Sequence, residues 1–434
     1  MSLPIFHDAT LVAEIDVGEE GPQLRYDSAW LPELDAFPIS LTMPLSHEVY
    51  GADAIVPWLM NLLPEGEPLR AMTRALGVSR DDILGLIAHT GRDLAGALTL
   101  GAPRPGQEPG FIPITEPSRL EQIIEGLPAR PFLVGEAGVS MSLAGAQEKL
   151  PLARSGQHLA IPINGAASTL ILKPDNSRLP GSVQNEALCM VLARRCGLLT
   201  APVTTGVAGA RTYLLVDRYD RVEREGRIVR VHQEDFCQAL RRPPAAKYQH
   251  NHSGIPGPSL GEMFALVRRH MTARDITRLL DAVIFNVAIG NVDSHAKNYS
   301  ILLQPGRAEL APLYDLMSGL AWDNITQNHA QDVGDQQRGR HIYGRHWRRM
   351  AAAAGLAGPA TVRRVARVTT RILAELPAAV EEVRAMPAGG ASLAVFAAAM
   401  AERADLVRRH AAIEAGPEAE PVDEPGGPQR RYDA

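Results

Sequence analysis

The chain has 434 residues, 45% hydrophobic and 21% charged, and its formal net charge of −5 gives no global argument for nucleic-acid binding. This length can bury a large core in about two or three domains or lobes, and the composition is that of an ordinary soluble globular protein. We expect a cytoplasmic protein, because no apolar run reaches the length of a membrane span and the N-terminus lacks the regions of a secretory signal.

Residues 1–105 are predicted to form a small N-terminal α/β subdomain. Within it, residues 36–45 have the composition of a strand punctuated by prolines, and a helical region is predicted over 58–88. Residues 91–100 are typical of a turn that enters a strand. A linker is expected at 101–110, because its prolines and glycines sustain neither helix nor strand.

Residues 106–240 are predicted to form a lobe of short strands with a helix. A buried strand carries Lys173 near its end, and the helix that begins at Ser182 carries Glu186 near its start. In protein kinases, a strand lysine contacts the nucleotide phosphates and is held by a helix glutamate. Lys173 taken alone could equally be a strand-end lysine that reaches solvent, and Glu186 could simply favour the helix dipole.

Residues 241–415 are predicted to form a mainly helical lobe, followed by a tail at 416–434 with the composition of a disordered segment. Apolar residues between Ile276 and Val287 form one helical stripe, so this helix delivers its end into the loop that follows. The alanine-rich part after Met350 is predicted to contain several helices. Interruptions are expected at Gly355, Pro359, Pro377 and Pro387.

Two other groups of residues carry little specific signal. The cysteines lack C-x-x-C spacing and are expected to be buried apolar side chains; they are Cys189, Cys196 and Cys237. Basic residues between Arg338 and Arg349 are more typical of a solvated helix face than of a DNA-binding surface, although they remain the best candidates for an anionic partner.

The loop after the apolar helix carries the strongest chemical pattern. Asp293 and Asn298 have the D-x-x-x-x-N spacing of a kinase catalytic loop, and Asp315 follows the next strand-like segment. Phosphoryl transfer needs a carboxylate that orients a hydroxyl and hard oxygen ligands that hold magnesium. In the purely structural alternative, Asp293 and His295 only cap a helix end and stabilise a turn.

Motifs along almost the whole chain resemble the HipA family, the serine/threonine kinase toxins of bacterial HipBA toxin–antitoxin modules. The resemblance rests on ordered motifs rather than on one signature. They are Asn61–Gly66, Gly91–Ala97, Ser142–Lys149, Ser182–Glu186, Asp217–Arg221, His232–Gln238, Asp293–Asn298 and Leu313–Ser318. The first two indicate the long form of the family, which has an N-terminal subdomain.

The resemblance implies an α+β fold of two kinase-like lobes behind that subdomain. It also implies that Asp293 is the catalytic base, that Asn298 and Asp315 are magnesium ligands, and that Lys173 contacts the phosphates of ATP. His295 could contact a phosphate oxygen or could serve the backbone of a tight loop. Further nucleotide contacts implied by the resemblance are Glu234, Phe236, Lys297 and Tyr314.

A loop over the nucleotide phosphates is implied for Ala144, Gly145, Ala146, Gln147, Glu148 and Lys149. Its small residues permit close backbone approach to an anion, although alanines stand where glycines are commoner. Ser142 matches the position at which family members phosphorylate themselves and lose activity. Ser140 is a nearby competitor, and a strand-end serine without a role is the plain alternative.

The predicted function is an ATP- and Mg²⁺-dependent protein serine/threonine kinase that acts as a growth-arresting, persistence-linked toxin. The family implies an aminoacyl-tRNA synthetase as substrate, with glutamyl-tRNA synthetase as the best-known case, and a HipB-like helix-turn-helix antitoxin that links the complex to operator DNA. Ser294 and Gln184 depart from the common family residues, outside the expected chemistry. The alternatives are a kinase with another protein or a small-molecule substrate, and a catalytically silent co-repressor.

Overall fold

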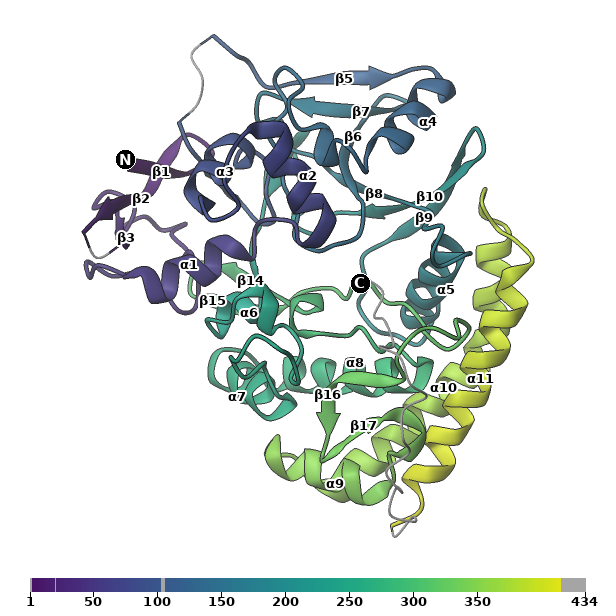
Figure 1. Ribbon diagram of the computed structural model, residues 1–434. Helices are drawn as coiled ribbons and strands as arrows, with labels where there is room; N and C mark the ends of the chain where they lie inside the picture. The colour runs from purple at the N-terminus through teal and green to yellow at the C-terminus, as the bar shows by residue number, and fades with distance from the viewer. Residues whose placement is uncertain (1, 20, 103–105, 415–434) are drawn as a thin grey trace. The chain divides into compact units, whose positions relative to one another are not determined.

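The structure is a computed structural model that describes residues 2–19, 21–102 and 106–414 (Figure 1). These residues form two compact units that alternate along the chain. The first unit contains residues up to Pro174, then Val207–Ala245 and Ser300–Ala311. The second contains Asp175–Gly206, Ala246–Tyr299 and the residues from Pro312 onward. Helices and strands are both abundant, and the fold class is α+β, as predicted.

The N-terminal part of the first unit is an antiparallel sheet with the strand order β3-β2-β1-β4. Its strands are β1 (Ser2–His7), β2 (Thr10–Gly18), β3 (Gly21–Tyr26) and β4 (Leu98–Leu100). The helices of this part are α1 (Ala52–Met60), α2 (Gly66–Leu76) and α3 (Ile83–Thr90). Their apolar faces share one core with the sheet, in which Ile5, Ile15 and Trp58 are almost completely buried.

Two expectations for this part are corrected. The predicted helical region 58–88 is divided among α1, α2 and α3, and Pro64 lies in the break between α1 and α2. Residues 36–45 form an isolated bridge between Ser40 and Met43 instead of a strand. Four apolar side chains still enter the core, namely Ala36, Phe37, Ile39 and Met43, so the composition indicated burial correctly at these positions and the backbone conformation wrongly.

A second sheet has the strand order β5-β7-β6-β8-β10-β9. Its strands are β5 (Gly110–Ile114), β6 (Leu150–Ser155), β7 (His158–Ile163), β8 (Leu170–Pro174), β9 (Val203–Ala208) and β10 (Arg211–Asp217). α4 (Pro117–Gly126) and η1 (Pro131–Leu133) supply apolar side chains to its core. The predicted buried strand that carries Lys173 is β8, a central strand of this sheet.

Smaller elements complete the first unit. The hairpin β11 (Arg221–Arg224) and β12 (Arg227–Arg230) turns at Gly226, which has a φ of 74°. A three-stranded sheet has the order β13-β14-β15. These strands are β13 (His232–Asp235), β14 (Ser300–Gln304) and β15 (Arg307–Leu310), and the short helix α6 (Phe236–Ala239) follows β13. The 3-10 turn η2 is Pro244–Ala246.

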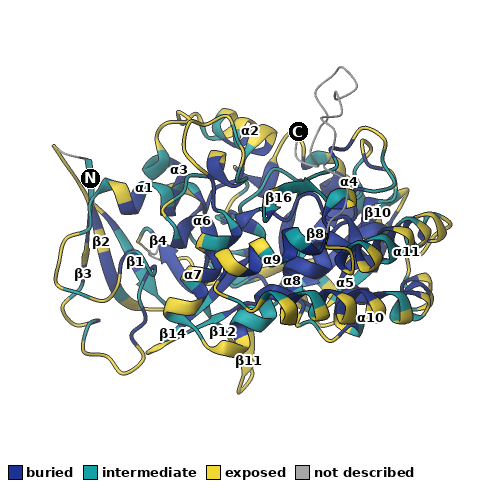
Figure 2. Ribbon diagram, turned by 90° about the horizontal axis from the view of Figure 1, so that it is seen from below, coloured by how far each residue is buried: buried dark blue, intermediate teal, exposed yellow. Residues whose placement is uncertain are grey.

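The second unit is mainly helical. Its helices are α5 (Ser182–Arg195), α7 (Leu260–His270), α8 (Ala273–Ile289), α9 (Gly344–Ala353), α10 (Gly358–Arg384) and α11 (Ser392–Ala411). Its smaller elements are η3 (Ala296–Asn298), η4 (Gly339–His341), β16 (Asn328–Val333) and β17 (Gln336–Arg338). Most residues of α5 and α8 are buried, whereas α10 and α11 keep one exposed face (Figure 2).

The ends of α8 explain how the chain enters the loop at 291–298. Thr272 and Asp275 form a capping box at its start, which satisfies backbone N–H groups that have no helical partner. Gly290 ends the helix with a φ of 70°, in the left-handed region where a side chain would be strained. A Cβ atom at this position would also collide with Leu320. The predicted delivery of the helix end into the loop is confirmed.

The expected interruption at Pro377 is wrong, because α10 continues through this residue. A proline inside a helix removes one backbone hydrogen bond. Buried residues on both sides, including Ile372, Leu376 and Val380, keep the helix in contact with its neighbours. Pro359 instead lies in the first turn of α10, where a proline is well tolerated.

Several predictions concern the chain as a whole. The described cysteines are all buried, and among the described residues no helix is long and apolar enough to cross a membrane. The predicted tail at 416–434 lies outside the described residues. The boundaries predicted near residues 105 and 240 stay predictions.

Candidate active site

Asp293 lies in a tight loop whose shape is set by hydrogen bonds to its own backbone. The N–H of His295 and the side-chain amide of Asn298 both donate to the Asp293 carbonyl, at 2.7 and 2.8 Å. The Asp293 residue is 8% exposed. Asn298 therefore serves the loop through its amide nitrogen, while its amide oxygen is the kind of hard ligand that Mg²⁺ prefers. The spacing of Asp293 and Asn298 is thus a structural as well as a chemical feature.

Buried amide side chains hold this loop against the end of α8. Asn291 accepts the N–H of Asp293 at 3.1 Å and donates to Asn286 at 3.0 Å, and Asn286 donates to the hydroxyl of Tyr299 at 2.8 Å. His329, on β16, lies 3.0 Å from the Asn291 carbonyl. Sequence reasoning assigned none of these residues a role. In the sequence, only Asn286 stands out among these residues, because it is a polar residue near the end of a stripe of apolar positions.

A tyrosine distant in the sequence reaches the proposed base. The hydroxyl of Tyr248 donates a hydrogen bond to Oδ1 of Asp293. The ring of Tyr248 meets the imidazole of His295 edge-on, with the ring centroids 5.1 Å apart. Tyr248 lies in an irregular segment rich in proline and glycine, where no periodic pattern points to a site. Sequence reasoning therefore missed it.

The segment that carries Asp315 lies against the loop at 291–298, which is the predicted catalytic loop. Tyr314 donates from its hydroxyl to the carbonyl of Lys297 at 2.7 Å, and Leu313 forms a bridge with Thr200. Asp315 has a φ of 57°, a conformation that is uncommon for a residue other than glycine. Asp315 and Asn298 offer a carboxylate and an amide oxygen. This donor set suits Mg²⁺, which takes few protein ligands beside waters and substrate phosphates.

In the first unit, the Asn61–Gly66 motif contacts the loop implied to cover the phosphates. The N–H of Glu65 donates to the Gly145 carbonyl at 3.1 Å, and Lys149 donates to the Ala144 carbonyl at 2.7 Å. Gly145 has a φ of 104°, and a Cβ there would come within 2.7 Å of the Lys149 ammonium. The loop residues 144–149 are partly exposed. Glycine is therefore favoured at position 145 by its backbone conformation rather than by space, because the lysine side chain could move away from a Cβ.

Ser142 is completely buried, with 0% of its surface exposed. Its hydroxyl donates to the Leu62 carbonyl at 3.0 Å, and its N–H donates to the Asp93 carbonyl at 3.2 Å. Ser140, its competitor, donates to the His89 carbonyl at 2.8 Å and is partly exposed. In this conformation the Ser142 hydroxyl cannot reach a phosphoryl donor, so its phosphorylation requires the loop to leave.

Lys173 and Glu186 stand on the elements that the sequence predicted. Lys173 is 7% exposed and lies opposite Leu214 in the β8–β10 pairing. Glu186 is 1% exposed on α5. Lys173 belongs to the first unit and Glu186 to the second, so their pairing stays a prediction.

The side chains of Glu234 and Phe236 lie in the interior of the first unit. Glu234 accepts hydrogen bonds from the Ser40 hydroxyl at 2.5 Å and from the Leu41 N–H at 2.8 Å. Burial raises the pKa of its carboxyl to about 8. Phe236 is 0% exposed at the start of α6. Their contacts with a nucleotide stay a prediction.

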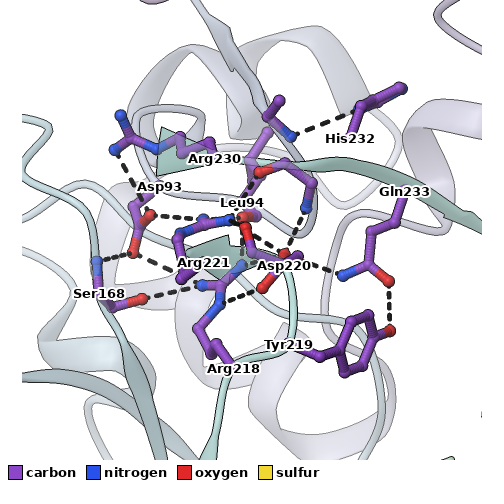
Figure 3. Close-up of polar contacts among 12 residues, drawn as sticks. Asp93, Leu94, Ser168, Arg218, Tyr219, Asp220, Arg221, Arg230, His232 and Gln233 are labelled. Atoms are coloured by element: carbon purple, nitrogen blue, oxygen red, sulfur yellow. Dashed lines mark hydrogen bonds and ion pairs between the residues drawn. The ribbon is translucent and has the colours of Figure 1, made fainter. Parts of the chain in front are cut away.

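A buried ionic cluster joins the Gly91–Ala97 motif to the Asp217–Arg221 motif (Figure 3). Arg221 contacts the Asp93 carboxylate at 3.0 Å, and Arg218 contacts Asp220 at 2.7 Å. All four side chains are 1–2% exposed. Burial would raise the pKa of Asp93, but the charges of Arg218, Arg221 and the nearby Arg230 outweigh burial and lower it. The four side chains therefore stay charged, and their ion pairs hold the two motifs together.

The same aspartate also holds the segment that contains Ser142. The N–H of Asp93 donates to the Ser140 carbonyl at 3.1 Å, and the Asp93 carbonyl accepts the N–H of Ser142. Its carboxylate accepts the N–H of Ser168 at 3.2 Å. Asp93 thus links the ionic cluster to the backbone beside the phosphate loop.

Comparison with known proteins agrees with this architecture. Residues 141–380 match the family model HipA-like C-terminal domain, and residues 3–101 match the HipA N-terminal domain. The putative kinase Y4mE of Sinorhizobium fredii is 37% identical over 94% of this chain and 98% of its own length. The serine/threonine-protein kinase toxin HipA of Shewanella oneidensis is 30% identical over 83% of each chain.

A solved structure shows the same fold. It contains HipA of Shewanella oneidensis with HipB and operator DNA, and it matches 94% of this chain and 99% of its own chain with a TM-score of 0.82 and 27% identity. The predicted kinase-like architecture with an N-terminal subdomain is confirmed by this match. The chain belongs to the HipA family of serine/threonine-protein kinases.

Proposed function

We propose that the protein transfers the γ-phosphoryl group of Mg-ATP to a serine or threonine hydroxyl of another protein. The observation that carries this proposal is the loop in which Asn298 fixes the backbone of Asp293, with the Asp315 segment bound to the same loop through Tyr314 and Lys297. This arrangement combines a buried carboxylate with two oxygen ligands for a hard cation, as phosphoryl transfer requires.

Each residue then has a distinct task. Asp293 orients the acceptor hydroxyl and accepts its proton, while Asn298 and Asp315 would hold magnesium through their side-chain oxygens. When bound, the metal supplies positive charge to the phosphates. Lys173 contributes a further cation on a rigid strand, and the loop 144–149 offers backbone N–H groups to the phosphates. His295 and Lys297 remain candidate phosphate contacts.

A direct test is phosphate transfer from isotopically labelled Mg-ATP to candidate acceptors. Glutamyl-tRNA synthetase is the first candidate, and other aminoacyl-tRNA synthetases form the comparison set. We expect label on one of these proteins with the wild type and none with Asp293→Asn. Labelling only of a small molecule would support the alternative kinase, and nucleotide binding without any transfer would support the silent co-repressor.

The metal assignment has a separate test in Asp315→Asn. This change removes a charged ligand but keeps the size of the side chain, so Mg-ATP affinity should fall together with turnover. Calorimetric titration with ATP in the presence and absence of Mg²⁺ measures this directly. Unchanged Mg-ATP affinity would remove Asp315 from the metal site.

We further propose that the protein acts as the toxin of a type II toxin–antitoxin system, with a HipB-like antitoxin that links it to operator DNA. The support is the similarity to Shewanella oneidensis HipA, whose solved structure is a complex with HipB and operator DNA. In the described residues, Arg348 pairs with Glu414 and Arg349 with Asp335, so acids compensate the basic run on α9. We therefore expect DNA affinity to depend on the antitoxin, which gel-shift assays with and without a co-expressed helix-turn-helix protein can test.

A further inference from the structure

We propose that Tyr248 is a positioning residue for phosphoryl transfer, which holds the Asp293 carboxylate in the orientation that receives the acceptor hydroxyl. This inference rests on the proposed role of Asp293 as the base. Tyr248 and Asp293 both belong to the second unit, so their contact does not depend on how the two units are placed.

Tyr248 contacts the catalytic loop at two points. Its hydroxyl donates to Oδ1 of Asp293, and its ring meets the His295 imidazole at an interplanar angle of 80°. A carboxylate on a short side chain can rotate about its terminal bond, because such sp³–sp² torsions are broad. A hydrogen bond to one oxygen restricts this rotation. The ring contact with His295 fixes the direction from which the hydroxyl arrives.

The segment around Tyr248 is itself rigidly attached. The Lys247 carbonyl accepts the N–H of Ala296, in the catalytic loop, at 3.1 Å. On the other side, the N–H of Gln249 donates to the Ala330 carbonyl at 3.0 Å. Backbone hydrogen bonds therefore flank Tyr248 at both neighbouring positions.

The side chain of Gln249 adds a reciprocal pair of bonds. Its amide nitrogen donates to Oδ2 of Asp332 at 2.9 Å, and its amide oxygen accepts the Asp332 N–H at 3.0 Å. Asn251 in turn donates to the Tyr248 carbonyl at 2.9 Å. With its backbone held in this way, the Tyr248 hydroxyl has a defined position. Little conformational entropy is then lost when it forms the hydrogen bond that orients the carboxylate.

The chemistry of a phenol suits this task. A tyrosine hydroxyl donates a hydrogen bond without carrying a full charge. A donor favours the ionised form of a carboxylate, which is the form that accepts a proton. Unlike a guanidinium, it adds no full positive charge that would make the carboxylate a poor base.

Burial argues against a purely structural role. Tyr248 is only partly buried, and it is absent from the buried apolar residues that form the core. The Lys247 ammonium lies 5.4 Å from the centre of its ring, a contact that needs the ring and not the hydroxyl. Tyr248→Phe therefore removes the bond to Asp293 while it keeps the ring contacts. Tyr50→Phe is the matched control, because its hydroxyl donates to the Pro44 carbonyl at 2.5 Å in the first unit.

The experiment measures turnover of Mg-ATP, through phosphate transfer to the protein itself and to water. For Tyr248→Phe we expect kcat to fall about tenfold with little change in KM for Mg-ATP, since a hydrogen bond to a charged group is lost. Tyr50→Phe should match the wild type.

Each outcome decides between the assignments. A kcat of Tyr248→Phe equal to the wild type, with Asp293→Asn inactive, would overturn the inference and leave the proposed function intact. Near-normal turnover by Asp293→Asn would overturn the base assignment and the inference together. Phosphate found on Tyr248 itself by peptide mass spectrometry would make this residue an acceptor, which also overturns a positioning role.

Discussion

Two buried aspartates in this protein are held in different surroundings. In the first unit, the Asp93 carboxylate lies among the guanidinium groups of Arg218, Arg221 and Arg230. In the second unit, Asp293 accepts hydrogen bonds from the Tyr248 hydroxyl, the Asn298 amide and the N–H of His295. The first arrangement binds two sequence motifs together through full charges. The second orients one residue within a tight loop through hydrogen bonds.

The structural role of Asp93 and the proposed role of Asp293 make different demands on a carboxylate. A structural aspartate contributes most when its charge is compensated by nearby cations, which lower its pKa and make proton uptake unfavourable. A general base must be able to accept a proton during the reaction, so strong cationic partners would oppose its work. Neutral hydrogen-bond donors can orient such a carboxylate at lower cost to its basicity. We expect substitutions in the two regions to separate stability from catalysis.

The largest effect is expected at Asp293. Asp293→Asn keeps an oxygen that can accept from Tyr248 but removes the proton acceptor, so phosphoryl transfer should fall by about 10²- to 10⁴-fold. Thermal stability and Mg-ATP binding should stay close to the wild type. Rapid-quench kinetics, scanning calorimetry and nucleotide titration measure the three quantities. A large fall in thermal stability of Asp293→Asn would instead give this residue a structural role.

Asp93→Asn should show the converse. The change leaves Arg218 and Arg221 buried with insufficient compensation, so the free energy of unfolding should fall by about 3–5 kcal/mol. Urea unfolding followed by circular dichroism measures this loss. Asp53→Asn, which removes an exposed partner of Arg241, is the matched control and should change stability little. Equal effects of the two substitutions would show that the buried cluster contributes no more than a surface pair.

Ser142 tests how firmly the first unit holds its loop. Ser142→Asp places a charge where the native hydroxyl is completely buried against Leu62, so the loop should leave and nucleotide affinity should fall by at least about tenfold. Ser142→Ala removes the same hydroxyl without the charge and should weaken binding less. Equal affinities of the two variants in calorimetric titrations would contradict a mechanism based on charge.

Self-phosphorylation gives a second measurement on the same residue. After incubation with Mg-ATP, peptide mass spectrometry should find one phosphate on the peptide that contains Ser142, and this phosphate should be absent from Asp293→Asn. Modification should be slower than transfer to a good substrate, because Ser142 must first leave its buried position. Phosphate on Ser140 alone would identify the more exposed competitor as the site.

A pH-dependent effect is expected at Glu234, whose pKa is raised from 4.5 to about 8 by burial. Between these pH values the folded protein holds a proton that the unfolded chain has released, so the free energy of unfolding falls as pH rises and levels off above the folded pKa. Glu234→Gln keeps an acceptor for Leu41 but removes this titration. The variant should match the wild type near pH 4.5 and melt a few degrees higher above pH 8, by calorimetry. Melting curves that stay parallel across this range would show that Glu234 does not titrate there.

Local sequence patterns identified the elements that carry the chemistry. The apolar stripe between Ile276 and Val287 predicted α8, and the strand with Lys173 and the helix with Glu186 appear as β8 and α5. These predictions succeeded because side-chain periodicity and capping residues act over one or two turns of chain. Pro377 and residues 36–45 were misjudged because packing against distant elements outweighed local preference.

The residues that surround the site could not be identified in this way. Tyr248 is separated from Asp293 by 45 positions, and Glu234 contacts Ser40 across 194 positions. Glu234 and Phe236 were assigned to the nucleotide because their motif resembles the family, whereas their burial became visible only in the fold. The number of residues between two side chains does not predict such contacts, because the fold of the intervening segments decides how far apart the side chains lie.

The sequence by itself determined the family, the kinase-like loop of Asp293 and Asn298, and the main helices and strands, since each depends on residue types within a few positions of one another. Tertiary structure alone decided which groups surround the carboxylates. It placed three arginines around Asp93 and a tyrosine hydroxyl on Asp293, and it buried Ser142 under the N-terminal motifs. The physical reason is that the charge environment of a buried group is a sum over neighbours in space, which elements far apart in the chain provide.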